Sequence, residues 1–174
     1  MPSLVAHPIV EDPVYPIVDE TFAYWMSKGG DTLKLRKAVE GSCGFVLPGP
    51  GACIALSEKE QAVWAAPDQW FVMGVNPPAS LASHIHFAEQ SDGRVVFSLP
   101  DLEGRDLLAA GCSVDLHPEA FLPGMAATSK INHFTALFWQ PTLEPKRINV
   151  AVFRSYAQSF NSWLGDRRRS QQQI

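Results

Sequence analysis

The sequence predicts an α+β domain in which a mainly antiparallel sheet is combined with a few helices. Three observations support this prediction. Most segments with a regular apolar pattern are short and fit strands. Three further segments carry apolar residues at helical spacing. Strands and helices do not alternate one by one, as they do in chains that form parallel sheets.

The first 30 residues are predicted to form an extended arm, because four prolines remove backbone donors and favour extended geometry in the residues before them. The arm also carries large apolar side chains, which a free tail would not retain. We expect it to dock on a neighbouring subunit, with its own domain as the alternative, so that deleting residues 1–26 leaves the body folded. The expected interface residues are Phe22, Tyr24, Trp25 and Met26.

Residues 31–165 are predicted to form one domain in which strands dominate. A hairpin joins 61–65 to 69–73 through the turn at Pro67 and Asp68, with Trp64 and Trp70 as candidate core residues. Further strands are expected, in chain order, at 33–39, 52–56, 94–99, 125–132, 134–140 and 148–153.

Three helices complete the prediction. Asn76 is placed to cap a helix over 77–89, whose prolines suit a first turn. A second helix is expected over 101–110, before Gly111. The third follows the apolar spacing of residues 153–164 and ends at Gly165, which leaves 166–174 as a flexible tail.

The amino-acid composition argues against several classes of function. The chain has 174 residues, which fits one domain, and 18% of them are charged, below the ~25% of typical soluble domains. A permanent partner would cover the surface that so few charges leave apolar. With 14 basic against 18 acidic residues, nucleic-acid binding is not expected. No apolar run is long enough for a membrane helix and no secretory signal is visible at the start, so we expect a cytoplasmic protein.

The search for catalytic and metal-binding motifs predicts no catalytic residue, no cofactor-binding residue and no metal ligand. Three cysteines are too few for a disulfide framework. Cys43 and Cys112 lack the basic partner or helix N-terminus that activates a thiol, so buried structural thiols are expected. His84 and His86 could share a metal ion only in an extended segment, and zinc requires three or four ligands.

Six segments follow, in order, the sequence patterns of one known family. Residues 44–48 read GFVLP against the family's GxALP, and 63–72 read VWAAPDQWFV against WLGPDEWLL. Similar matches occur at 91–97, 104–118, 120–128 and 152–164. Together these segments resemble the gamma subunit of heterotetrameric sarcosine oxidase over roughly residues 33–165.

The resemblance implies a non-catalytic subunit with a fold like the folate-binding domain of aminomethyltransferases. Complexes of this family oxidatively demethylate sarcosine to glycine, form hydrogen peroxide and pass the one-carbon unit to tetrahydrofolate, or release it as formaldehyde. The implied partners are the alpha, beta and delta subunits. FAD, FMN, NAD, tetrahydrofolate and zinc are implied in those subunits, and no cofactor in this chain. The substrate is sarcosine or a related N-methyl amine.

Two other functions stay open. The chain could be a stand-alone folate-binding or aminomethyltransferase-like protein, although relatives that serve iron–sulfur assembly carry the signature KGCYxGQE. The nearest stretch here, residues 110–115, lacks its Tyr, Gln and Glu. The third hypothesis is a thiol enzyme that uses Cys43 or Cys112.

Overall fold

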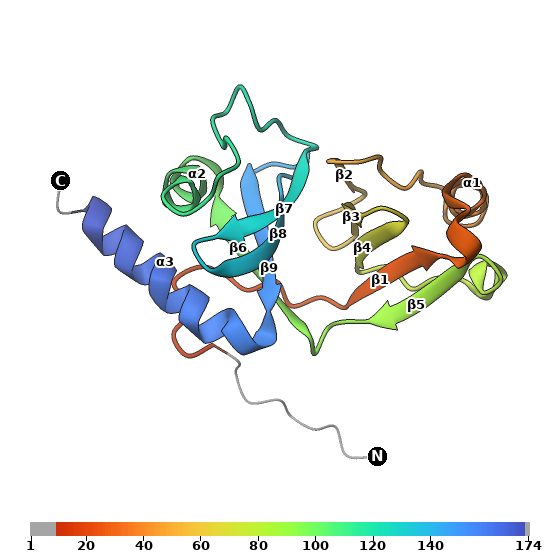
Figure 1. The fold of residues 1–174 in the computed structure, drawn as a ribbon, viewed down its shortest axis with the longest axis horizontal. Coiled ribbons are helices and arrows are strands. Elements are labelled where there is room, and N and C mark those ends of the chain that lie inside the picture. The colour runs from red at the N-terminus through yellow and green to blue at the C-terminus, as the bar shows by residue number, and fades with distance from the viewer. Residues whose placement is uncertain (1–9, 173–174) are drawn as a thin grey trace, which may run out of the picture.

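The computed structural model describes residues 10–172 and has two antiparallel sheets (Figure 1). The five-stranded sheet has the order β2-β3-β4-β1-β5 and the four-stranded sheet the order β6-β9-β8-β7. The strands of the first sheet are β1 Phe22–Ser27, β2 Cys53–Ala55, β3 Gln61–Ala66, β4 Gln69–Met73 and β5 Ile85–Glu89. Those of the second are β6 Arg94–Pro100, β7 Ala126–Ile131, β8 Phe134–Trp139 and β9 Arg147–Phe153. The predicted α+β class with antiparallel sheets is confirmed.

Helices cover the outer faces of both sheets, so that the molecule has four layers. The helix α1 (Thr32–Cys43) packs on the five-stranded sheet, and α2 (Asp101–Ala109) and α3 (Ala157–Gln171) pack on the four-stranded sheet. Figure 1 shows α1 at one end and α2 and α3 at the other. Three short 3₁₀ turns, η1 Lys28–Gly30, η2 Ala79–Leu81 and η3 Arg154–Tyr156, lie between these elements.

The strands bury side chains on both faces because each sheet lies between a helical layer and the other sheet. In β4, Trp70 and Val72 face α1, whereas Phe71 and Met73 face the four-stranded sheet. The ring of Phe71 lies 6.0 Å from that of Trp139 across the two sheets. This period of two places one hydrophobic cluster between the sheets and one on each outer face.

Residues 22–27, assigned to the arm by the sequence prediction, form the strand β1 between β4 and β5. The chain before it lies on the four-stranded sheet and on α3. Ile17 bridges to Phe97 of β6, and the Asn161 side chain of α3 accepts a hydrogen bond from the Val14 N–H at 2.8 Å. The described part of the arm is therefore packed on its own chain.

The prediction of a strand at 33–39 is wrong, because these residues form part of the helix α1. The side chain of Asp31 accepts a hydrogen bond from the Lys34 N–H and caps the first turn, and Gly44 at φ 75° ends the helix. Leu35 and Val39, four residues apart, face the sheet, whereas Leu33 is exposed.

The helix predicted over 77–89 is also wrong. Only Ala79–Leu81 forms a 3₁₀ turn, and Ile85–Glu89 is the strand β5. This segment forms a strand rather than a helix because it pairs with β1 along its whole length. The local apolar spacing could not show this partner.

The third predicted helix continues past Gly165 to Gln171, so residues 166–171 are not a tail. Gly165 packs close to Val14 of the chain before β1. Arg168 forms an ion pair with Glu103 of α2, and Arg169 one with Asp166. These contacts extend the helix through the arginine run. Residues 173–174 lie outside the described residues.

The remaining elements follow the prediction. The hairpin of β3 and β4, the strands β6 to β9 and the helix α2 lie within a few residues of their predicted positions, and the strand predicted at 52–56 is shortened to β2. Trp70 is buried and Trp64 half-buried. Gly104 lies inside α2 at a position where an added Cβ would come within 2.9 Å of the Leu99 Cβ. The absence of a side chain there lets the helix pack closely on β6.

Candidate functional site

A pocket of about 320 Å³ opens between the two sheets. Its floor comes from two cross-strand pairs, Gln61 with Met73 in the five-stranded sheet and Ser98 with Asn149 in the four-stranded sheet. The walls are formed by residues before β1, before β3, between β8 and β9, and at the start of β9: Pro16, Val18, Glu58, Pro141, Leu143, Glu144, Pro145 and Arg147.

The floor of this inter-sheet pocket is polar although it is buried. Gln61 is 3% exposed and Asn149 is 4% exposed. The Gln61 Oε1 accepts hydrogen bonds from Trp139 Nε1 at 2.8 Å and from Asn149 Nδ2 at 3.4 Å. Within residues 10–172, Asn149 Oδ1 and Ser98 Oγ have no hydrogen-bond partner. Neither atom is among the fully buried polar atoms that lack a partner, so water can reach both through the pocket.

One cation also lines the pocket. Arg147 is half-buried and lies two residues before Asn149 in β9, so the two side chains share a face of the strand. Its guanidinium forms no hydrogen bond or ion pair with any residue that the structure describes. The exposed Glu58 and Glu144 also line the pocket. The inter-sheet pocket thus combines a free cation with unpaired acceptors and apolar walls.

A second, wider groove of about 590 Å³ runs between α2 and residues 112–118. Its buried charge is Arg105, which is 4% exposed and already donates hydrogen bonds to Asp101, Gln140 and two backbone carbonyls. Because its guanidinium is satisfied within the chain, Arg105 acts as a structural residue.

The two cysteines expected to be buried, Cys43 and Cys112, are both half-buried. Cys53 is buried, and burial raises its pKa to about 12. Its thiol donates a hydrogen bond to the Gln140 carbonyl at 3.3 Å. Burial also raises the pKa of the half-buried Cys43. Both shifts favour the protonated thiol, which is a poor nucleophile.

The two candidate histidines are not gathered into a metal site. His84 lies before β5, and a hydrogen bond of 2.9 Å joins its Nδ1 to the Ser83 hydroxyl. His86 lies in β5 opposite Met26. Among residues 10–172, no group of three His, Cys, Asp or Glu side chains could hold a metal ion.

We predict that Cys53 resists alkylation in the folded chain. The variant Cys43→Ser/Cys112→Ser, which keeps only Cys53, should react with iodoacetamide only after denaturant is added. The free energy of unfolding should also fall as pH rises from about 9 towards 12, because the folded state keeps a proton that the unfolded chain loses near the ordinary value of 9.0. Rapid labelling of the folded variant would contradict this.

The four predicted interface residues divide into two pairs. Phe22 and Trp25 are 4% and 0% exposed, and both belong to hydrophobic clusters of their own chain. Tyr24 and Met26 are half-buried. Tyr24 accepts a hydrogen bond from Arg94 at 3.0 Å. Phe22 and Trp25 are therefore not available to a partner in this fold, whereas Tyr24 and Met26 keep some exposed surface.

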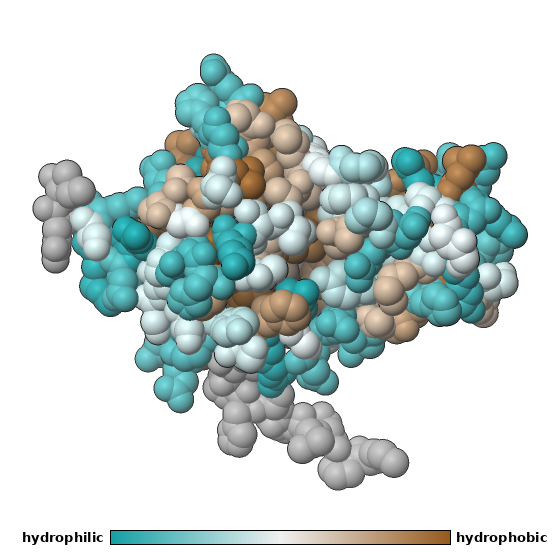
Figure 2. Space-filling model, viewed as in Figure 1, coloured by the Kyte–Doolittle hydropathy of each residue, from teal (hydrophilic) through white to brown (hydrophobic). Residues whose placement is uncertain are grey.

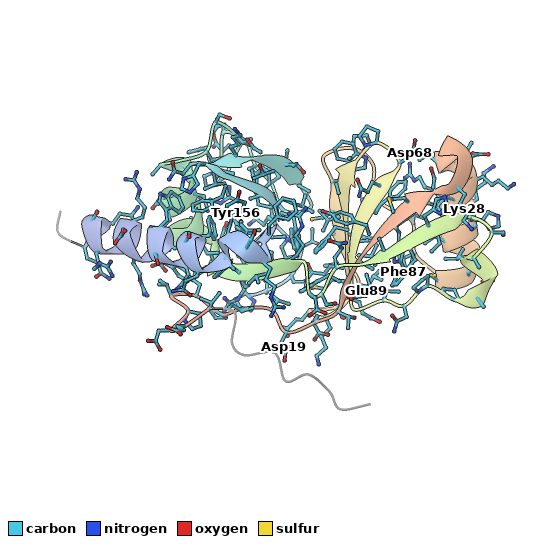
Figure 3. All side chains as sticks on the ribbon, turned by 60° about the horizontal axis from the view of Figure 1, so that its bottom comes forward. Asp19, Lys28, Asp68, Phe87, Glu89 and Tyr156 are labelled. Atoms are coloured by element: carbon cyan, nitrogen blue, oxygen red, sulfur yellow. The ribbon has the colours of Figure 1, made fainter. Side chains whose placement is uncertain are left out.

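Other apolar side chains are more exposed than these. In Figure 2, apolar colours gather beside the loop between α2 and β7. Figure 3 labels Tyr156, which lies just before α3, and Phe87, which lies in β5 of the other sheet. The large apolar residues with the most exposed surface are Leu33, Val46, Leu56, Phe87, Leu102, Leu122, Phe153 and Tyr156. None of them is among the four interface residues expected from the sequence.

The sequence did not predict the inter-sheet pocket, and the reason is physical. Its residues come from five separate stretches of the chain, and only the strand register brings Ser98 opposite Asn149 and Gln61 opposite Met73. The one usable signal was a polar residue at an inward position of an apolar strand, as at Asn149.

Fold and pocket together define an α+β protein of two packed antiparallel sheets with a polar pocket between them. The fold is similar to that of a chain in the heterotetrameric sarcosine oxidase from Corynebacterium sp. U-96, a structure determined in complex with pyrrole 2-carboxylate. The TM-score is 0.72 at 21% sequence identity, over 87% of this chain and 80% of the other. At this identity the likeness shows a shared fold.

Other comparisons add little. No family model matches the sequence, and no curated protein matches it. None of the helices within residues 10–172 combines the length and apolar character needed to cross a membrane.

Proposed function

We propose that this chain is the gamma-type, non-catalytic subunit of a heterotetrameric sarcosine oxidase-type complex. The observation that carries the proposal is the shared fold over 87% of this chain and 80% of a chain from such a complex, which is therefore of similar length. The six sequence segments that resemble the gamma subunit add independent support.

Contacts between those segments support a common fold. Trp70, in the segment 63–72, donates a hydrogen bond from its indole to the Pro48 carbonyl of the segment 44–48 at 2.9 Å. Arg105, in 104–118, donates to the Phe121 carbonyl of 120–128. Phe160, in 152–164, packs edge-on against Phe97 of 91–97. Residues that carry the resemblance therefore hold the domain together.

In the proposed complex this chain contributes surface rather than chemistry. The partners are the alpha, beta and delta subunits, which hold FAD, FMN, NAD, tetrahydrofolate and zinc. The complex demethylates sarcosine or a related N-methyl amine. The exposed apolar side chains, above all Leu102 and Leu122, are the proposed contacts, because exposed apolar surface favours association.

The proposal is tested by purifying the tagged full-length chain from its native cell. We expect three other chains in fixed stoichiometry, a flavin absorbance spectrum, and hydrogen peroxide formed when sarcosine is added. Expressed alone, the chain should self-associate because its contact surface is uncovered.

The double variant Leu102→Glu/Leu122→Glu should lose the partner chains, whereas the matched Lys34→Glu/Lys37→Glu variant on exposed positions of α1 should keep them. A chain that purifies alone as a stable monomer and binds tetrahydrofolate saturably would contradict the proposal and favour the stand-alone folate-binding function.

A further inference from the structure

We propose that the five-stranded sheet continues into a second copy of this chain, through antiparallel pairing of the two β5 strands about a twofold axis at Phe87. The inference rests on the geometry of the sheets and is independent of the proposed complex. Among the residues that the structure describes, β5 pairs with β1 on one side and with no strand on the other. Figure 1 shows β5 along the lower margin of its sheet.

The other three sheet edges are each paired with a further segment of the chain over part of their length. The segments that do so are residues 16–18 beside β6, Gly124 and Met125 beside β2, and Gly111 and Cys112 beside β7. A sheet edge that is left open presents unpaired N–H and C=O groups to which another strand can bind. The edge formed by β5 is therefore the one to which a further strand has free access along its whole described length.

The backbone groups that β5 directs outwards follow from its pairing with β1. At one end of the strand, the Gln90 N–H donates to the Phe22 carbonyl at 2.8 Å. At the other end, the Lys28 N–H donates to the His84 carbonyl at 2.9 Å. Because hydrogen-bonded residues alternate along an antiparallel pair, the even-numbered residues of β5 face β1. The residues whose N–H and C=O groups face outwards are Ile85, Phe87 and Glu89.

A twofold axis at Phe87 makes this edge complementary to itself. It sets Phe87 opposite the same residue of the second copy, and Ile85 opposite Glu89. Each of these pairs can exchange two hydrogen bonds across the axis, as hydrogen-bonded antiparallel pairs do. The Phe87 side chain is 44% exposed, so the two rings meet on one face of the joined sheets. Aromatic pairs directly opposite each other stabilise a sheet.

The charges around β5 permit this register. Glu89 lies opposite the uncharged Ile85, and on the other face His86 lies opposite Ala88, so no like charges meet. The exposed Lys28 lies beside the start of β5 and the exposed Glu89 at its end (Figure 3). Antiparallel pairing sets the basic end of one strand beside the acidic end of the other. The strand also contains no proline, lysine or bulge, which are the features that commonly protect an edge.

Disulfide cross-linking of the full-length chain tests the register, in the background Cys43→Ser/Cys112→Ser. The Cα atoms of a hydrogen-bonded antiparallel pair lie about 5.5 Å apart, which is within disulfide reach. Phe87→Cys should therefore form a covalent dimer of the chain on oxidation with copper phenanthroline. Glu89→Cys is the matched control, because the two copies of residue 89 lie about 13 Å apart along the strands, and should give at least tenfold less dimer.

Three outcomes of the cross-linking would overturn the proposal. The first is no dimer from Phe87→Cys, and the second is an equal yield from Glu89→Cys. The third is a cross-link from Phe87→Cys to a different chain when the variant is purified within a complex, because another subunit would then occupy the edge.

Sedimentation velocity measures the strength of the pairing. The background is Leu102→Glu/Leu122→Glu, which removes the contacts of the proposed complex, so that failure of this pairing is distinct from failure of that proposal. There, Phe87→Lys should raise the dimer dissociation constant at least tenfold, because two lysines would face each other. Leu33→Lys removes a more exposed apolar side chain of α1 and should stay within twofold. A monomeric background chain, or equal effects of the two lysine variants, would overturn the proposal.

Discussion

Deletion of residues 1–26 is expected to leave a chain that does not fold. The deletion removes most of β1, which pairs with β4 on one side and β5 on the other, so β5 loses its described partner strand. It also removes Trp25, which is fully buried. Truncating one buried Trp costs about 3–5 kcal/mol, against a typical net stability of about 5–15 kcal/mol. Circular dichroism and a denaturant titration should show no cooperative transition.

The matched control is deletion of residues 1–9, which lie outside the described residues. This shorter deletion leaves Tyr15, Ile17 and the whole of β1 in place, and should unfold cooperatively. A cooperative transition in the chain that begins at residue 27 would contradict the placement of β1, and would restore the expectation that the first 26 residues are dispensable for the body.

Replacing Arg105 by Met is expected to cost about 3–5 kcal/mol of stability, the range for breaking a buried ion pair. Arg105 pairs with Asp101 at 2.6 Å and donates to the Phe121 carbonyl at 2.9 Å. It also donates to the Leu116 carbonyl and to Gln140 Oε1. Its loss leaves a partly buried carboxylate and two carbonyls without this donor. The midpoint of urea unfolding measures the effect.

Two further variants separate charge from geometry. Arg105→Lys keeps the charge but not the fork of donors, and should fall between wild type and Arg105→Met. Arg154→Met breaks an ion pair with Asp92, a 94% exposed side chain, and should change stability by less than about 1 kcal/mol. Equal midpoints for Arg105→Met and Arg154→Met would show that the Arg105 network does not stabilise the fold.

The sequence predicted the parts of the fold whose signals are local. The β3–β4 hairpin was found because its turn and its two strands are contiguous. For α1, the cap at Asp31 and the stop at Gly44 were present, but the spacing of Leu33 and Leu35 was interpreted as strand alternation. The segment 85–89 could be assigned only through its partner β1, which is some 60 residues away.

The inter-sheet pocket was harder to predict from the sequence than the fold was. Asn149 and Gln61 are polar residues in apolar strands, which marks them as unusual, but nothing local indicates that they meet. Arg105 could have been found more readily, because Asp101 lies four residues before it on the predicted helix, the spacing of an intrahelical ion pair.

The stacking of the two sheets changes what the low charge content means. In a single sheet with one wet face, about every second strand residue is polar. Here β4 and β9 have apolar residues on both faces, because one face meets a helix and the other meets the second sheet. Much of the shortage of charged residues is thus accounted for inside the chain. Partner surfaces are better sought at individual exposed side chains such as Leu102 than in the overall composition.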